Sequence, residues 1–337
     1  MYKTSELSEL ENKLHIFLFY RTEYFQVISM LSVSRLAYLV SVLAATARSS
    51  IIVMNCNQGT QSQDVDNAIK DVAEVARVAA AALVSGKING KDDVFAAAYD
   101  PLMYPLDRPG LALTLGAVAT LGSSTTLNVQ IYCRENHIRY HKDDPKSYWE
   151  DRDYYSRANG KMMPIGVARN SKDKPGVKGS YTTLGYKAND AYDTSGMAHI
   201  FLHPRRLSPP AGTDRDLRRY PDIVKDGLDG KHNKIEDIKP LAQTLLHELI
   251  HAVGGLGPPD PVNKKRDMAI HDGPSGSPKV YGWAACNARR TRNEKNNDIA
   301  DCITFLAQAI YLQIQGKDTF WTTGEIDPKT LRPKQNP

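Results

Sequence analysis

The spacing of apolar and polar residues predicts five helices along the chain. At 64–83 apolar residues recur every three or four positions, which is the spacing of one helix face. The strongest pattern lies at 238–253, where Pro240 falls in the first turn and Gly254-Gly255 follow the end, as helix boundaries favour. The remaining helical patterns lie at 91–99, 283–292 and 298–315.

Strands are fewer and shorter. Residues 127–133 alternate apolar and polar side chains, as a half-buried strand should, and two further strands are expected at 180–187 and 197–203. The charged and aromatic stretch 134–157 is expected to be a long surface excursion, and the Pro- and Gly-rich stretches 204–239 and 255–279 are expected to be loops. This mixture predicts an α+β fold, with one domain at 48–317 and a loosely ordered tail at 318–337.

The first 47 residues are expected to lie outside that domain. Met30 and Arg35 precede a short apolar run, which ends at the small residues Ala44-Ala45-Thr46-Ala47. A basic residue, a short apolar stretch and an Ala-x-Ala site are typical of a secretory signal peptide, so residues 30–47 are expected to be one. Residues 1–29 would then be an over-extended N-terminus. A membrane anchor or an amphipathic helix is the alternative for this segment.

Composition narrows the class of protein. The chain has 337 residues, of which 41% are hydrophobic and 24% charged, as in an ordinary globular protein. A formal net charge of +5 is too small to indicate a dedicated nucleic-acid binder. The four cysteines follow residue 47, and an even number in a secreted chain suggests two disulfides. Three pairings are possible, among them Cys286 with Cys302 and Cys56 with Cys133.

The segment His247-Glu248-Leu249-Ile250-His251 carries the candidate chemistry. Residues four apart lie on the same face of a helix, so both imidazoles can bind one zinc ion. Glu248 would lie beside the ion without binding it and could act as a general base toward water. The alternative is a pair of surface histidines on a core helix. His137 and His141 are also four apart, but they lack an intervening Glu and are expected to be such a surface pair.

A catalytic zinc site needs a third protein ligand, and the residues leave its identity open. Gly257 stands at the sixth position after His251, where a metzincin has its third histidine. Asn293-Glu294 followed by Asp298 has the form of a gluzincin helix, although its polar surroundings suggest a solvated turn. The loop after the zinc helix offers three aspartates: Asp260, Asp267 and Asp272.

The chain resembles fungal deuterolysin-like metallopeptidases, the aspzincins, and their lysine-specific endopeptidase relatives. The resemblance rests on the His-Glu-x-x-His segment, then on Tyr281-Gly282-Trp283 with Cys286, and on 299–302 leading into 306–312. It covers roughly the last third of the chain after residue 47. It implies a zincin-like fold with a mixed sheet, an antiparallel edge strand over the zinc helix, and C-terminal helices. By position, 197–203 is the expected edge strand.

The resemblance also implies roles for individual residues. His247 and His251 would bind zinc, Glu248 would be the general base, and Tyr281 would stabilise the oxyanion. The family places its aspartate ligand three residues before the tyrosine, where this chain has Pro278. Asp272, ahead of a Gly/Pro/Ser insertion, is therefore the expected metal ligand. The weaker candidates are Asp267, Asp301, Glu294 and His271.

These observations predict a secreted, monomeric zinc endopeptidase. Its partners would be protein or peptide substrates, and neither nucleic acid nor stable membrane association is expected after signal removal. The irregular spacing to the third ligand motivates an alternative, a secreted binding or effector protein that keeps the scaffold but hydrolyses poorly. A purely structural zinc is a third possibility, in which Glu248 would have no purpose.

Overall fold

The computed structural model divides the chain into two compact units, Met1–Arg48 and Ser49–Pro337. Only the second contains residues that the structure describes, so the expected signal peptide and N-terminal extension lie outside them. The described residues are 51–54, 56–105, 107–121, 128–133, 138–140, 149–151, 163–165, 185–188, 197–202, 204–208, 215–228, 231–254, 269–274, 277–315 and 324–325.

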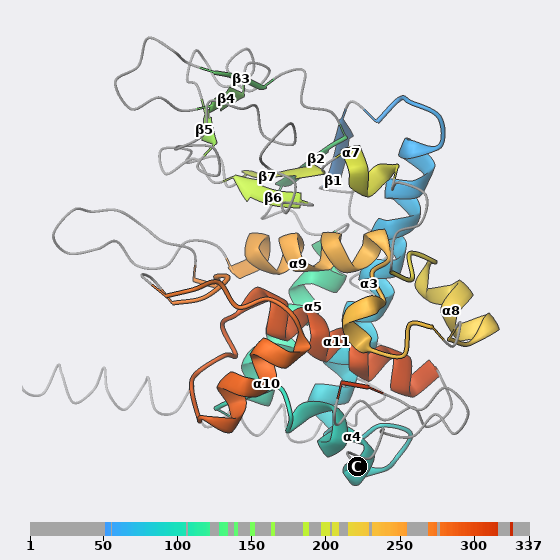
Figure 1. Ribbon diagram of the computed structural model, residues 1–337, viewed down its shortest axis with the longest axis vertical. Coiled ribbons are helices and arrows are strands. Elements are labelled where there is room, and N and C mark those ends of the chain that lie inside the picture. The colour runs from blue at the N-terminus through green and yellow to red at the C-terminus, as the bar shows by residue number, and fades with distance from the viewer. Residues whose placement is uncertain are drawn as a thin grey trace, which may run out of the picture. The chain divides into compact units, whose positions relative to one another are not determined.

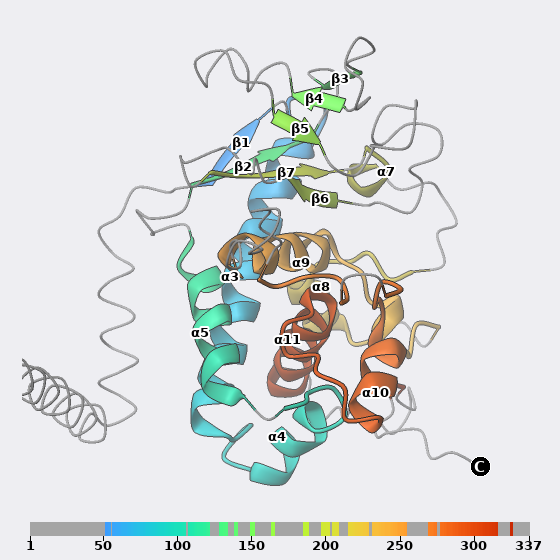
Figure 2. The ribbon, with the colours of Figure 1, turned by 90° about the vertical axis from the view of Figure 1, so that its left-hand side faces the viewer.

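A mixed four-stranded sheet lies on one side of the unit (Figures 1 and 2). Its order is β1 (Ile51–Met54), β2 (Asn128–Tyr132), β7 (Met197–Leu202) and β6 (Gly185–Ala188). The first three strands run parallel, and β6 pairs antiparallel with β7. On the central strand β2 both faces are buried, from Val129 to Tyr132. Continuous burial of this kind is characteristic of interior parallel strands.

Helix α9 (Leu241–Gly254) lies between this sheet and the other large helices. It contacts strand β6 on one side and α3, α5 and α11 on the other. Because it is enclosed in this way, ten of its fourteen residues are buried. The helices that surround it are α3 (Gln61–Ser85), α5 (Arg108–Ala119) and α11 (Ala300–Gln315).

The remaining elements are short. Helices α4 (Asp92–Tyr99) and α10 (Trp283–Thr291) both contact the α11 region, and a small antiparallel sheet consists of three strands of three residues each. Its strands are β3 (Ile138–Tyr140), β4 (Trp149–Asp151) and β5 (Met163–Ile165). Three more short helices, α7 (Pro204–Leu207), α8 (Tyr220–Asp226) and the 3₁₀ helix η3 (Ile235–Asp237), precede α9.

The α+β class, the five predicted helices and the expected central strands are present, with shifted ends. The prediction of an edge strand at 197–203 is wrong, because β7 has β2 on one side and β6 on the other. The antiparallel edge strand next to α9 is β6. The loop predicted at 204–239 instead contains three short helical elements, and α5 was not predicted at all. Helix α9 begins just after Pro240 rather than at residue 238.

Two disulfides join the elements as the sequence suggested. Cys56 and Cys133 follow the neighbouring strands β1 and β2, and their Cα atoms are 4.9 Å apart. Cys286 of α10 is bonded to Cys302 of α11, with Cα atoms 5.5 Å apart. One disulfide therefore links two neighbouring strands of the sheet, and the other links the two C-terminal helices.

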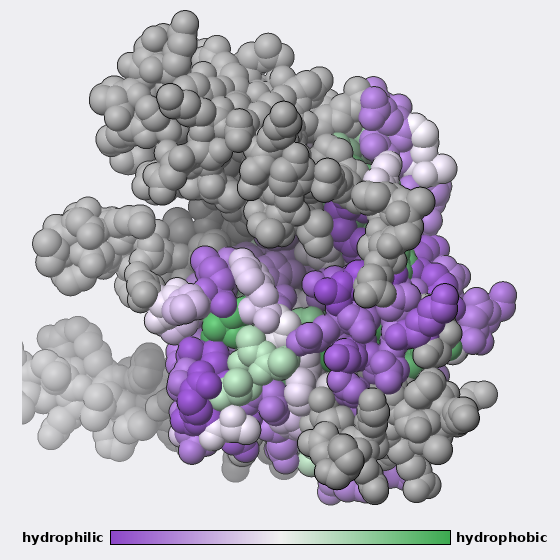
Figure 3. All heavy atoms as spheres, viewed as in Figure 1, coloured by the Kyte–Doolittle hydropathy of each residue, from purple (hydrophilic) through white to green (hydrophobic). Residues whose placement is uncertain are grey.

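The surface seen in Figure 3 is mostly hydrophilic among the described residues, with a small hydrophobic area in the region of α10. A search of the described helices finds none with the length and apolar character needed to cross a bilayer. Trp283, at the start of α10, is itself buried.

The first prediction concerns the burial of α9. Leu245 is fully buried, whereas Leu113 on α5 is 76% exposed. We expect Leu245→Ala to lower the free energy of unfolding by about 2–5 kcal/mol, because it removes a packed side chain and leaves a cavity. Leu113→Ala, the same chemical change on a helix surface, should alter it by no more than about 0.5 kcal/mol. Urea unfolding of both variants measures this, and equal losses would contradict the central position of α9.

Candidate metal centre

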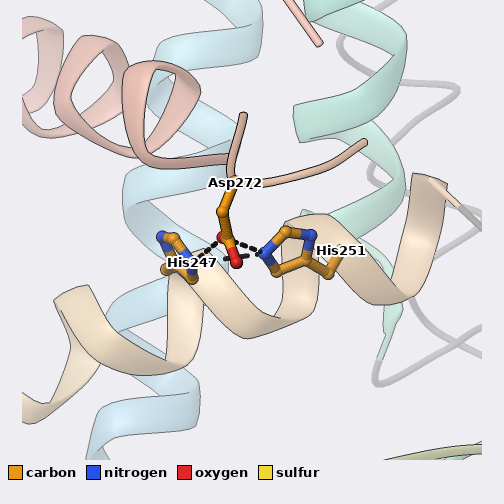
Figure 4. A group of neighbouring side chains, drawn as sticks. All are labelled: His247, His251 and Asp272. Carbon is orange, nitrogen blue, oxygen red and sulfur yellow. Dashed lines mark hydrogen bonds and ion pairs between the residues drawn. The ribbon is translucent and has the colours of Figure 1, made fainter. Parts of the chain in front are cut away.

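The two histidines of α9 face the same point. His247 and His251 are one helical turn apart, and their Nε2 atoms are 3.2 Å from each other. The burial of Leu245, Leu246 and Ile250 on the rest of the helix fixes the side that carries them. Among the described residues, His247, His251 and Asp272 form the group that could hold a metal ion (Figure 4).

Asp272 closes the triangle from the loop after α9. Its Oδ1 lies 2.9 Å from His251 Nε2 and 3.2 Å from His247 Nε2. The loop packs closely against the end of the helix at Gly254. A Cβ atom added to this glycine would come within 2.7 Å of Ile270. Glycine at the end of α9 therefore allows the approach that brings Asp272 over the two imidazoles.

The outer nitrogen of each imidazole is bonded to a fixed oxygen. His251 Nδ1 lies 2.8 Å from the backbone oxygen of Ile270, which can only accept a hydrogen bond. His247 Nδ1 lies 3.1 Å from Oδ1 of Asp301, at the start of α11. Protons on these outer nitrogens leave the two Nε2 atoms as the ones that could bind a metal ion. Two lone pairs and a carboxylate oxygen then meet at one point, where only a cation can relieve their repulsion.

A proton on His247 can supply that positive charge. Burial disfavours the charged form of His247, but its bonds to Asp272 and Asp301 outweigh burial and raise its pKa well above the usual value. Burial likewise disfavours the Asp272 carboxylate, yet the contacts with His247 and His251 hold its pKa well below its usual range. The site is therefore built to accept positive charge.

Glu248 and Tyr281 lie beside this triangle. Glu248 is only 5% exposed, and its negative charge contributes to the raised pKa of both His247 and Tyr281. The Tyr281 ring lies 6.2 Å from that of His247, measured between centroids. Tyr281 is 56% exposed, but partial desolvation of its hydroxyl, followed by the charge of Asp272, raises the Tyr281 pKa, so the phenol stays protonated near neutral pH.

Lys279 adds a positive charge at the rim. Its Nζ lies 3.1 Å from Oδ2 of Asp272, the oxygen that faces away from His251. The lysine is more than half exposed. No pattern in the sequence had singled out Lys279, because its role depends on the folded loop and not on a motif.

The other candidate ligands lie elsewhere or outside the described residues. Both carboxylate oxygens of Glu294 are bound by arginines, Arg292 and Arg289. His271 accepts a hydrogen bond from the backbone of Gly273 and is not in the group that could hold a metal. Asp301 lies behind His247 rather than at the point where the Nε2 atoms meet. The remaining residues considered, Asp260, Asp267, His137 and His141, lie outside the described residues.

No protein-family model matches this sequence, and a search of curated proteins finds no match either.

The second prediction concerns the charge pair in metal-free protein. Because the Asp272 pKa is lowered by folding, this carboxylate stabilises the folded state fully above the unfolded value of about 3.9. That stabilisation is lost as the pH falls further. Because the His247 pKa is raised by folding, the protonated imidazole stabilises the folded state fully below the unfolded value of about 6.5. That stabilisation is lost as the pH rises through the pKa of His247 in the folded protein. We therefore expect Asp272→Asn to lower the free energy of unfolding by about 1.5–3 kcal/mol between the two unfolded values, and by less at lower or higher pH.

Urea unfolding in the presence of a chelator, repeated across pH, measures this difference. Asp226→Asn, an exposed carboxylate on α8, is the matched control and should show no such window. A cost for Asp272→Asn that does not vary with pH would contradict the charge pair.

Proposed function

We propose that the protein is a secreted zinc-dependent endopeptidase whose metal is held by His247, His251 and Asp272. The observation that carries the proposal is the convergence of two imidazole nitrogens and one carboxylate oxygen beside a buried glutamate. Two nitrogens and one oxygen from three side chains are the ligand set of a catalytic zinc site, in which a fourth position stays open.

The distances between the three ligand atoms support this choice. Zinc–ligand bonds of about 2.0–2.1 Å at tetrahedral angles place two ligand atoms about 3.3 Å apart. The three separations here are 2.9, 3.2 and 3.2 Å. The group therefore needs only a small expansion to accept an ion of this size. When bound, zinc would supply Lewis acidity toward a peptide carbonyl and lower the pKa of water in the site.

The surrounding residues have clear roles in this reaction. Glu248 would take the proton of the attacking water and pass it to the leaving nitrogen, which is general base and then general acid catalysis. The hydroxyl of Tyr281 would donate a hydrogen bond to the substrate oxygen as negative charge develops there. Asp301 would hold His247 in the tautomer that binds metal. Tyr281 and Asp301 both contact His247, the residue next to Glu248 on α9.

The sheet offers a place for an extended substrate. Within the described part of the chain β6 pairs with β7 alone, and it lies against α9. A peptide that added to this edge by backbone hydrogen bonds would run antiparallel or parallel to β6 beside the metal centre. This arrangement supports the zincin-like fold and the resemblance to deuterolysin-like metallopeptidases as proposals. The two disulfides support an oxidising location such as the extracellular space.

The third prediction tests Glu248 as the base. Glu248→Gln keeps the size of the side chain but cannot accept the proton, so we expect peptide hydrolysis to fall by about 10²–10⁴-fold. Digestion of denatured casein by wild type, by this variant and by chelator-treated wild type measures the effect. Equal activity of all three would refute the protease. Bound zinc without hydrolysis by the wild type would favour a binding or effector protein.

The fourth prediction tests the third ligand. Asp272→Ala removes the only carboxylate within the ligand triangle of the described residues, so we expect purified protein to contain far less than one equivalent of zinc. Glu294→Ala is the matched control and should keep a full equivalent, since arginines hold its carboxylate. Elemental analysis after dialysis measures both. Full zinc occupancy in Asp272→Ala would move the third ligand elsewhere, first to Asp267.

A further inference from the structure

The first turn of α11 contacts every segment that carries a residue of the metal centre. Asp301 reaches His247 of α9, as described above. One residue earlier, the backbone N–H of Ala300 donates to the His271 oxygen at 3.0 Å, next to the ligand Asp272. Asp301 also accepts a hydrogen bond on its second oxygen, Oδ2, from the backbone N–H of Gly282. Gly282 directly follows Tyr281.

The backbone at Gly282 strongly favours glycine. Its φ of +88° lies in the region that favours glycine, and an added Cβ would come within 2.7 Å of Oε1 of Glu236. The same Glu236 oxygen accepts the N–H of Ala284 at 2.7 Å. Two carboxylates, Asp301 and Glu236, therefore hold the start of α10 and fix the backbone that presents Tyr281.

A covalent link reinforces this junction. Cys302 follows Asp301 directly, and its partner Cys286 begins the hydrogen bonding of α10 with an N–H that donates to the Gly282 oxygen at 3.2 Å. The disulfide thus joins the two helix starts that Asp301 joins by hydrogen bonding. Asp301 itself is only 7% exposed, so water competes little for its two oxygens.

We propose that Asp301 is a positioning residue that couples metal ligation to the placement of Tyr281, with one carboxylate oxygen on each. The inference rests on the proposed function, because it assigns Tyr281 to the reacting carbonyl. Oδ1 keeps the proton of His247 on Nδ1, which leaves Nε2 for the metal. Oδ2 holds the Gly282 N–H and so the Tyr281 backbone. Asp301 contacts neither substrate nor metal.

The structure of an amide shows why the carboxylate is needed. Asp301→Asn keeps the shape but has one acceptor oxygen and one donor NH₂. If the oxygen stays on Gly282, the NH₂ faces His247 Nδ1 and favours the tautomer that cannot bind metal through Nε2. If it turns to His247, the NH₂ meets the Gly282 N–H and displaces Tyr281. Either orientation impairs one of the two groups.

The experiment compares zinc affinity and hydrolysis in the full chain. For Asp301→Asn we expect zinc affinity, measured by competition with a chromophoric chelator, to fall about 10–100-fold. With zinc saturating, we expect kcat on a reporter peptide to fall with little change in KM, since Tyr281 acts on the transition state. Glu294→Gln, in the segment between α10 and α11, is the control and should change neither quantity.

A double variant separates positioning from general damage. Tyr281→Phe should lower kcat without changing zinc affinity. If Asp301 acts through Tyr281, then Asp301→Asn combined with Tyr281→Phe should lower kcat by clearly less than the product of the two separate effects. Asp301→Glu, which keeps both carboxylate oxygens, should recover part of the zinc affinity. If Asp301→Asn does not fold, Asp301→Ala, which removes both acceptor oxygens, takes its place in every comparison.

The outcomes distinguish this inference from the proposed function. Zinc affinity and kcat within twofold of wild type in Asp301→Asn, or kcat effects that multiply fully with Tyr281→Phe, would overturn the positioning role while leaving the protease intact. A wild-type protein that binds zinc but does not cleave peptides would refute the proposed function. In that case the affinity measurement still decides whether Asp301 positions His247.

Discussion

The candidate metal centre depends on one electrostatic constraint, which is that three electron-rich atoms meet at a single point. Hydrogen bonds on the outer side of the imidazoles leave His247 Nε2 and His251 Nε2 directed at an oxygen of Asp272. Without a cation these atoms would repel one another in a poorly solvated place. The contacts with Asp272 and Asp301 raise the pKa of His247, which favours positive charge at this point.

The fold serves this constraint by making α9 rigid and by bringing other segments to it. Packing against β6, α3, α5 and α11 leaves the helix little freedom to rotate. The loop with Asp272 returns to its C-terminal end through the close contact of Gly254 with Ile270, and α11 supports it from behind through His271. Ligands from distant parts of the chain are thus fixed by backbone contacts as much as by their own side chains.

Periodicity was sufficient to predict the elements that are long and amphipathic, α3, α9 and α11. It failed where tertiary pairing decides. The mostly apolar run 197–203 cannot reveal whether a strand has one neighbour or two, and β7 proves to be internal. The short helical elements within 204–239 span too few residues to show a helical period. In α5, Gly110 and Gly116 obscure a helix with an apolar composition.

The residues of the site also differ in how far the sequence could predict their placement. The spacing of four between His247 and His251 is a property of one helix, so the sequence alone predicted that both imidazoles share a face. The contact of Asp301 with His247 spans 54 residues and has no local signal. Asp301 was considered only as a weaker candidate ligand, whereas the structure places it on the outer nitrogen of His247.

The irregular distance between Asp272 and Tyr281 has a physical explanation in the loop that separates them. The N–H of Val280 donates to the Asp272 backbone oxygen at 2.6 Å, and the N–H of Ser277 donates to the Pro274 oxygen at 3.0 Å, so backbone hydrogen bonds hold the described residues on the two sides of this stretch together. Tyr281 therefore follows a residue that is bonded to Asp272, whatever the number of residues in the stretch. The cost of closing a flexible loop grows slowly with its length, so an insertion here changes little. The four-residue spacing of the histidines has no such freedom, because one added residue would rotate His251 by about 100° away from His247.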